Sequence, residues 1–517
     1  MLASLATASP ARDWQWAPRL SLQERYTDNV RLQPKGAAHS AWITEVQPGL
    51  SVVRRGGRIR LDADYSLQGY YHTGEGDRSG LRHNLAAQGR AELVEDWFYL
   101  DATARAAQQI IDYAGGIGLG DAVGIRNTAQ TFGYTLSPYL RHRFGPLGTL
   151  EIRYSLEGYS IDDASGLSDS TSQRYSLRAA SGPYFHPLSW SLSYEQRTTD
   201  YQRQEDTDSE SASAQARLQV SREFGILAHG AWQKYDFPGA AARIRDFSHH
   251  GLGLFYTPGR RLSAELAYNW SERGDFVSGS LTLRPTLRTT VEWSRTQQNF
   301  GRSQALSLHH RARKSNMGLI YQEGLSSYDQ LFLTNAFDAW LCGDVLSFPI
   351  APGRPVPDGC RRLTLTELRT LFGAGAFLPV RLGQTFINKG LTGLYSHEFR
   401  RATLSLSVFD QRAIYQGTGV QGREDRRTGL QAALSLRPGE RTTLTLSGGY
   451  THLEVDDPNS AVDDREDDYW NLGLTLTRRF QPKVAGSLEL RHQQRDARGA
   501  SQDYRENAVA ARLDMRF

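Results

Sequence analysis

Residues 470–476 read WNLGLTL, and this short stretch shows the pattern that decides the fold. Its even positions hold one tryptophan and three leucines, whereas Asn, Gly and Thr occupy the positions between them. Residues 402–408 (ATLSLSV) show the same period of two. Because successive side chains of a β-strand point to opposite faces, each stretch predicts a strand with one apolar and one polar face.

The same alternation recurs from one end of the chain to the other, and it predicts about 24 strands, within a range of about 22–26. Short joints, most of which contain Gly or Pro, alternate with longer polar stretches. The short joints are residues 55–57, 95–96, 144–148, 186–189, 257–260, 437–440 and 480–483. The longer stretches are residues 74–80, 115–124, 204–210, 417–425 and 456–467. An even strand count places both chain ends on the side of the short joints.

Composition excludes several classes of protein. The 517 residues carry a formal net charge of +4, which is too balanced for a nucleic-acid surface. The mean hydropathy is −0.52. No apolar run approaches the roughly 18 residues of a membrane-spanning helix. A helical membrane protein is therefore excluded, although ten tryptophans and 24 tyrosines still need an environment that accepts aromatic side chains.

Strands with an apolar and a polar face, short turns on one rim and long loops on the other are typical of an outer-membrane β-barrel. Hydrocarbon offers no partners to the backbone, so a sheet that spans it must close on itself. We therefore predict an all-β, transmembrane, antiparallel up-and-down barrel in the outer membrane of a Gram-negative bacterium, in contact with its lipid and lipopolysaccharide. A soluble β-propeller is the alternative, but strands in soluble proteins average only about 5–6 residues.

The last residues support the barrel. Between Val509 and Phe517 every second residue is apolar, and the residues between them include Arg512, Asp514 and Arg516. A terminal aromatic residue on an amphipathic last strand resembles the signal that barrel-assembly machinery recognises. We therefore predict that Phe517 is an assembly signal. Seven tryptophans near predicted strand ends fit interfacial girdles: Trp42, Trp97, Trp190, Trp232, Trp270, Trp293 and Trp470.

The predicted domain organisation is simple. Residues 1–13 are interpreted as the remnant of a signal peptide or as a disordered tail, because they end in small residues without a basic start or a full apolar segment. Residues 14–517 form one barrel domain. Its first strand is expected to begin near Trp16, which leaves no space for an N-terminal plug and disfavours a TonB-dependent receptor.

One insertion, residues 329–384, is too long for an ordinary turn and is expected to be an extracellular loop that enters or caps the lumen. It contains both cysteines of the chain, Cys342 and Cys360. In an oxidising compartment two cysteines in one loop are expected to form a disulfide, worth roughly 3 kcal/mol in the chain-entropy model. Two unpaired thiols are the alternative.

The polar strand faces are expected to line a hydrated pore. Barrels of 16–18 strands already leave an aqueous channel. The candidate pore-lining residues mix both charges: Arg58, Arg60, Asp62, Asp64, Asp101, Arg105, Glu489, Arg491, Arg512, Asp514 and Arg516. The mixture favours weakly selective passage of polar solutes or of a neutral to mildly charged polymer, because a selective filter would be a ring of one sign.

We therefore predict a porin-like channel. A surface scaffold or adhesin that acts through its outer loops is the alternative. No catalytic, metal-binding or phosphate-binding motif is present in the sequence, so we expect no enzyme activity, no cofactor, no metal and no nucleic-acid partner.

Residues 18–30 read PRLSLQERYTDNV and include the piece Tyr26-Thr27-Asp28-Asn29-Val30. This piece resembles the opening strand of a family of porin-like outer-membrane barrels that are associated with PEP-CTERM protein-sorting systems. Members of that family tend to accompany exopolysaccharide loci. The resemblance implies exopolysaccharide export as a function and exopolysaccharide as a partner, and it implies no catalytic residues.

Overall fold

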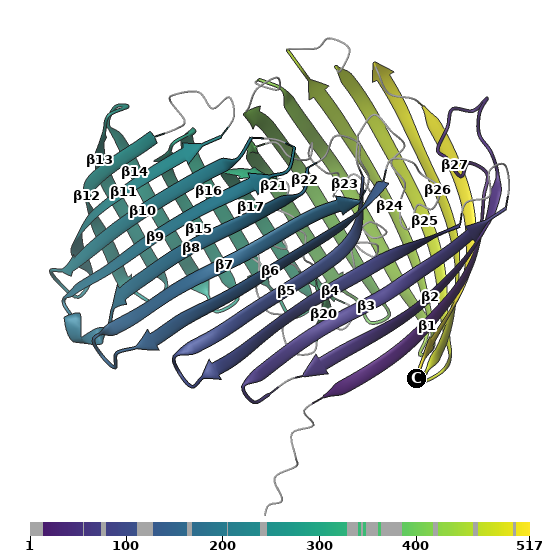
Figure 1. Cartoon of the computed structure of the whole chain (residues 1–517), viewed down its shortest axis with the longest axis horizontal. Coiled ribbons are helices and arrows are strands. Elements are labelled where there is room, and N and C mark those ends of the chain that lie inside the picture. Colours follow the sequence, from purple (N-terminus) through teal and green to yellow (C-terminus); the bar gives the residue numbers. More distant parts are fainter. Residues whose placement is uncertain are drawn as a thin grey trace, which may run out of the picture.

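The computed structural model shows a closed barrel of 24 antiparallel strands (Figure 1). The structure describes residues 14–54, 56–73, 79–110, 128–162, 168–203, 205–237, 246–327, 340–342, 345–347, 360–362, 385–416, 422–458, 464–499 and 503–517. The predicted fold class and strand number are confirmed. No helix among these residues is long and apolar enough to cross a membrane.

The barrel strands are β1–β17 and β21–β27, and β18–β20 form a separate small sheet. In chain order the strands are β1 (Gln15–Thr27), β2 (Ala41–Arg54), β3 (Ile59–His72), β4 (Ser79–Val94), β5 (Phe98–Ile110), β6 (Thr128–Arg143), β7 (Gly148–Asp162), β8 (Ser170–Ser181), β9 (Leu188–Tyr201), β10 (Thr207–Gln219), β11 (Phe224–Asp236), β12 (Asp246–Gly259), β13 (Leu262–Ser271), β14 (Phe276–Thr286), β15 (Thr289–Gln298), β16 (Gly301–Arg311), β17 (Ser315–Ser327), β18 (Trp340–Cys342), β19 (Val345–Ser347), β20 (Cys360–Arg362), β21 (Thr385–Glu398), β22 (Ala402–Gln416), β23 (Glu424–Gly439), β24 (Thr442–Asp456), β25 (Arg465–Gln481), β26 (Val484–Gly499) and β27 (Tyr504–Arg516). One short 3-10 helix, Pro183–Phe185, lies in the turn between β8 and β9.

The first and last strands close the barrel. β1 pairs with β27 from Arg19 opposite Arg516 to Thr27 opposite Ala508, and β1 also pairs with β2. β17 pairs directly with β21, so the long insertion between them does not interrupt the wall. Closure leaves no strand edge exposed to hydrocarbon, as a spanning sheet requires.

The two rims differ as the sequence predicts. The turns after β3, β5 and β7 lead to the long-loop rim, whereas those after β2, β4 and β6 are short and lie at the other rim. Backbone hydrogen bonds close the short turns, for example from the amide of Trp97 to the carbonyl of Val94 at 3.1 Å. The C-terminus lies on the short-turn rim, at the lower edge of Figure 1.

The outer face of the wall is apolar. One continuous cross-strand row over six strands consists of Leu404, Leu434, Leu446, Leu474, Leu490 and Val509. Leu446, Leu490 and Val509 of this row are about half exposed in the isolated chain. Such a surface is stable only against lipid, because a soluble monomer rarely exposes a contiguous apolar patch of this size. The chain is therefore a transmembrane β-barrel.

Aromatic residues border this apolar band at both rims. Near the long-loop rim Tyr450 contacts Trp470, with ring centroids 4.5 Å apart. Near the short-turn rim Trp97 stacks on His142 at 3.7 Å. Most of the predicted girdle tryptophans lie near strand ends, but Trp293 lies in the middle of β15.

The pairing between β16 and β17 ends before the strands do. Their pairing ends where Ala305 faces Gln322, although β17 continues to pair with β21 as far as Ser327. Beyond this point the Glu323 carboxylate accepts a hydrogen bond from the backbone amide of Gln304 at 2.9 Å. A side chain thus replaces the missing backbone acceptor at this seam.

The insertion at residues 329–384 contributes the small sheet, in which β18 lies between β19 and β20. Its register places Cys342 directly opposite Cys360. The rest of the predicted lumen loop lies outside the described residues, as do residues 1–13 of the predicted signal remnant or tail. The disulfide therefore stays a prediction.

Candidate functional site

The candidate site is the inner wall of the barrel, formed by the strand positions that alternate with the outer apolar rows. On β3 the outer positions include Leu61 and Tyr65, so Arg60, Asp62 and Asp64 lie on the opposite, inner face. The same alternation assigns to the inner face Asp101 and Arg105 of β5, Glu489 and Arg491 of β26, and Arg512, Asp514 and Arg516 of β27. Arg58 differs, because it lies in the turn before β3 and pairs with Glu95 of the next short turn at 2.5 Å. It is a rim residue.

Several candidate residues meet partners on other strands. Arg19 of β1 reaches across β2 to Asp64 of β3, with Nη2 donating to Oδ1 at 2.6 Å. Gly49 of β2 makes this crossing possible, because a Cβ at this position would lie 2.7 Å from Arg19 Nε. Arg491 meets Glu506 of β27 at 3.2 Å. Arg512 instead pairs with Asp514 of its own strand, at 2.9 Å.

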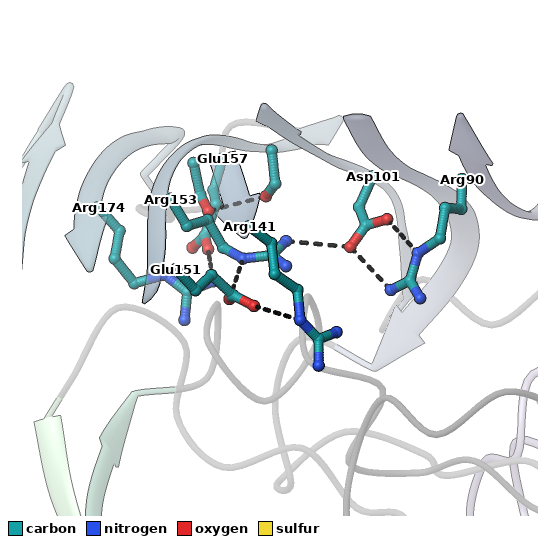
Figure 2. Close-up of polar contacts among 9 residues, drawn as sticks. Arg90, Asp101, Arg141, Glu151, Arg153, Glu157 and Arg174 are labelled. Atoms are coloured by element: carbon teal, nitrogen blue, oxygen red, sulfur yellow. Dashed lines mark hydrogen bonds and ion pairs between the residues drawn. The ribbon is translucent and has the colours of Figure 1, made fainter. Parts of the chain in front are cut away.

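Two neighbouring groups of contacts lie on β4–β9, and we call them together the arginine network (Figure 2). It consists of Arg90, Asp101, Arg141, Glu151, Arg153, Glu157, Arg174 and Arg197. All of these residues occupy inner positions of the register. Figure 2 shows the side chains projecting from one side of the strands, with both carboxylate oxygens of Asp101 engaged.

Arg153 lies at the centre of the network. Its Nη1 donates to Asp101 at 3.0 Å and its Nε donates to Glu151 at 3.2 Å. Its guanidinium lies 3.7 Å from the centroid of the Tyr139 ring, a cation–π arrangement. Asp101 also accepts two hydrogen bonds from Arg90, at 2.7 and 3.0 Å. The Arg153 side chain is only one-fifth exposed, so these contacts fix its position.

The second half of the network is centred on Glu157. This buried carboxylate lies 2.6 Å from Arg197 and 3.1 Å from Arg174. The whole network contains five guanidinium groups and three carboxylates, so positive charge is in excess. The exposed members are Arg90 and Arg141, whose side chains are each more than half exposed. Part of the excess positive charge, on Arg90 and Arg141, is therefore accessible to solvent.

Closer to the long-loop rim the inner pairs are buried. Asp467 of β25 lies 2.8 Å from Arg495 and 3.8 Å from Arg465, and its side chain has no exposed surface. Arg423, just before β23, lies 3.1 Å from Asp425 and 3.2 Å from Asp457. Burial alone would lower the pKa of the Arg423 guanidinium, but the charge of Asp425, the nearby Tyr415 and the hydrogen bonds to Asp425 and Asp457 together raise it.

The sequence did not identify most members of these clusters. Arg153 and Glu157 lie on a polar strand face that the two-residue period marks, and that period was the available signal. Asp467 and Arg495 lie beyond the apolar band, where both strand faces are polar and no period marks them. Their pairing was not visible, because Glu157 and Arg197 are 40 positions apart. Among the described residues no group of three His, Cys, Asp or Glu side chains is arranged to hold a metal ion.

The fold thus defines an integral protein of the Gram-negative outer membrane, because a closed barrel with an apolar exterior and a charged interior is the form in which sheets cross that membrane. No family model matches the chain, and no curated protein matches it.

Solved structures with similar architecture are outer-membrane proteins of low identity. They include the siderophore receptor PirA from Pseudomonas aeruginosa, with 8% identity, 97% of this chain and 80% of that chain covered, and a TM-score of 0.41. The FrpB iron transporter from Neisseria meningitidis (F3-3 variant) shows 10% identity, 98% and 82% coverage, and a TM-score of 0.47. OccD1 (OprD) shows 9% identity, 98% and 97% coverage, and a TM-score of 0.32. What the barrel does is inferred from its own wall.

Proposed function

We propose that the chain is an outer-membrane channel for polar solutes and that its wall favours anions. The arginine network carries this proposal, because five guanidinium groups and three carboxylates give this sector of the inner face a net positive charge. A wall of one predominant sign raises the local concentration of the opposite ion. The preference is mild, because carboxylates interleave with the arginines.

The dimensions of the barrel agree with a channel. Barrels of 16–18 strands leave an aqueous passage between inward side chains, and 24 strands enclose a wider bore. The inner side chains that are exposed, such as Arg90 and Arg141, offer charged groups to water in such a bore, which is why hydrophilic solutes are the expected cargo class. The Tyr26–Val30 resemblance adds a second cargo, an exopolysaccharide, and a positively charged wall is compatible with an acidic polymer.

Ion selectivity in planar bilayers tests the proposal. Under a tenfold KCl gradient the purified protein should conduct with a reversal potential displaced toward that of chloride. The double variant Arg153→Gln/Arg174→Gln should move the reversal potential toward zero. Arg498→Gln is the matched control, because Arg498 lies on the outer face and pairs with Glu466 at 3.1 Å. Absence of current, or a cation preference of the unchanged protein, would overturn the proposal.

Blocking experiments on the same channels distinguish the two candidate cargo classes. An acidic oligosaccharide that interrupts the current at lower concentration than a neutral one of equal length would support an acidic polymer as cargo. Equal, weak block by both would favour small polar solutes. Arg153→Gln/Arg174→Gln should remove the difference if the arginine network makes it.

A further inference from the structure

Three cationic side chains lie next to one another on the outer face of β21–β23. Lys389 faces Arg412, and Arg412 faces Arg426, in the register of the ladder. Arg412 follows Val408 by four positions, and Arg426 precedes Leu430 by four positions, so both lie on the same outer face as these apolar residues. We call Lys389, Arg412 and Arg426 the outer cationic row.

The row lies just beyond the apolar band, toward the long-loop rim. Val408 and Leu430 are in register with Tyr450 and Trp470 of the aromatic girdle. Four residues beyond that level correspond to about 13 Å along a strand, at about 3.3 Å per residue. With a tilt of about 40°, Arg412 and Arg426 lie roughly 10 Å above Val408 and Leu430 of their own strands, in the direction of the long-loop rim. The cations are thus at the level of lipid head groups in the outer leaflet.

Like charges directly opposite one another destabilise a sheet, so this row has a cost. Each cation is compensated by a carboxylate, and Arg426 in addition faces Glu454 of β24 in the register of the ladder. Lys389 lies 3.8 Å from Glu323, Arg412 pairs with Glu424, and Arg426 donates to Asp410 at 3.1 and 3.2 Å.

The two arginines meet these carboxylates with one edge only. Arg412 and Arg426 both use Nε and Nη2, so the Nη1 group of each takes no part in these pairs. About half of each arginine side chain and a third of the Lys389 side chain are exposed. The row therefore presents donors outward, toward the surrounding lipid.

We propose that the outer cationic row binds the phosphate groups of lipopolysaccharide. Phosphate accepts several charge-assisted hydrogen bonds, and arginine forks match its geometry. The position favours a lipid source, because the row faces the surrounding membrane at head-group height. Lipopolysaccharide is the anionic lipid of the leaflet on the long-loop side. The neighbouring carboxylates hold the arginines in place, but they also weaken the binding of a single phosphate. Lipids that offer more than one phosphate are therefore expected to bind best.

Native mass spectrometry tests the proposal by measuring how tightly purified lipid A binds to the detergent-solubilised full chain. The triple variant Lys389→Gln/Arg412→Gln/Arg426→Gln should bind bisphosphorylated lipid A about a hundredfold more weakly, because each basic side chain near an anionic lipid surface contributes about 1 kcal/mol. The control Arg54→Gln/Arg478→Gln removes two cations near the short-turn rim and should change binding less than twofold.

Two further measurements keep the test independent of folding. Asp410→Asn/Glu424→Gln removes competing acceptors and should tighten binding several-fold, an effect that a damaged barrel would not produce. Bilayer conductance of all variants should equal that of the unchanged protein. Three outcomes would each overturn the proposal. The triple variant could bind lipid A as tightly as the unchanged protein, or the unchanged protein could bind dephosphorylated lipid A as tightly as the bisphosphorylated form. Inorganic phosphate could also displace bound lipid A as effectively as free lipid A does.

Discussion

Replacement of Asp467 by asparagine should destabilise the folded barrel strongly. The Asp467 carboxylate is completely buried, lies 2.8 Å from Arg495, and lies 3.8 Å from Arg465. Removal of one partner from a buried ion pair costs about 3–5 kcal/mol, because the remaining charge has no compensation. Asparagine keeps the volume and one acceptor oxygen, so we expect the lower end, about 3 kcal/mol. This corresponds to about a hundredfold change in the folding equilibrium.

The neighbouring residue on the same strand supplies the control. Glu466 lies on the outer face and pairs with Arg498 at 3.1 Å, but 78% of the Arg498 side chain is exposed. Exposed pairs contribute only about 0–1 kcal/mol, so Glu466→Gln should cost less than about 1 kcal/mol.

Urea unfolding in detergent micelles, approached from both the folded and the unfolded side and followed by tryptophan fluorescence, measures both changes. The double variant Asp467→Leu/Arg495→Met should recover part of the loss, since apolar residues can replace a buried pair. Equal costs for Asp467→Asn and Glu466→Gln would refute the reasoning.

Three further predictions concern single features. Glu323→Ala should open the seam between β16 and β17, so the backbone amide of Gln304 should exchange its hydrogen at least tenfold faster. The control Glu292→Ala in β15 should leave the exchange rate of that amide unchanged. An unchanged rate in Glu323→Ala would contradict the role of this carboxylate. Cys342 and Cys360, opposite each other in the small sheet, should resist alkylation until a reductant is added, and labelling of both thiols in the non-reduced protein would exclude the disulfide. Phe517→Ala should lower the amount of heat-modifiable barrel in the outer membrane several-fold, whereas Phe517→Trp and Phe480→Ala should assemble normally; normal assembly of Phe517→Ala would show that the terminal ring is not the signal.

The fold could be predicted from the sequence because lipid imposes a strict period on every strand. Leu472, Leu474 and Leu476 of the opening stretch all lie on the outer face of β25, as their spacing requires. The strand ends were less accurate. Residues 465–467 were expected in a loop, but β25 already begins at Arg465. Beyond the apolar band both strand faces are polar, so the period of two disappears from the sequence while the ladder continues.

The candidate site could be predicted as a face but not as a set of contacts. The inner positions follow from the same alternation, and Asp101 and Arg491 were identified in this way. Their partners depend on the register between strands that are distant in sequence, such as Glu506 for Arg491. Arg58 was placed on the wall because the strand was expected to start earlier, whereas the turn extends to this residue. Charge excess in the arginine network likewise becomes visible only after the strands are aligned.

The central claim is that alternate residues of each strand face lipid and a water-filled lumen. Spin labels placed one at a time at positions 470–476 of β25, in a background with Cys342→Ser and Cys360→Ser, test it in reconstituted bilayers. Even positions should be relaxed by oxygen dissolved in the hydrocarbon, and odd positions by a water-soluble nickel chelate. Equal accessibility of neighbouring positions to both reagents would contradict the account.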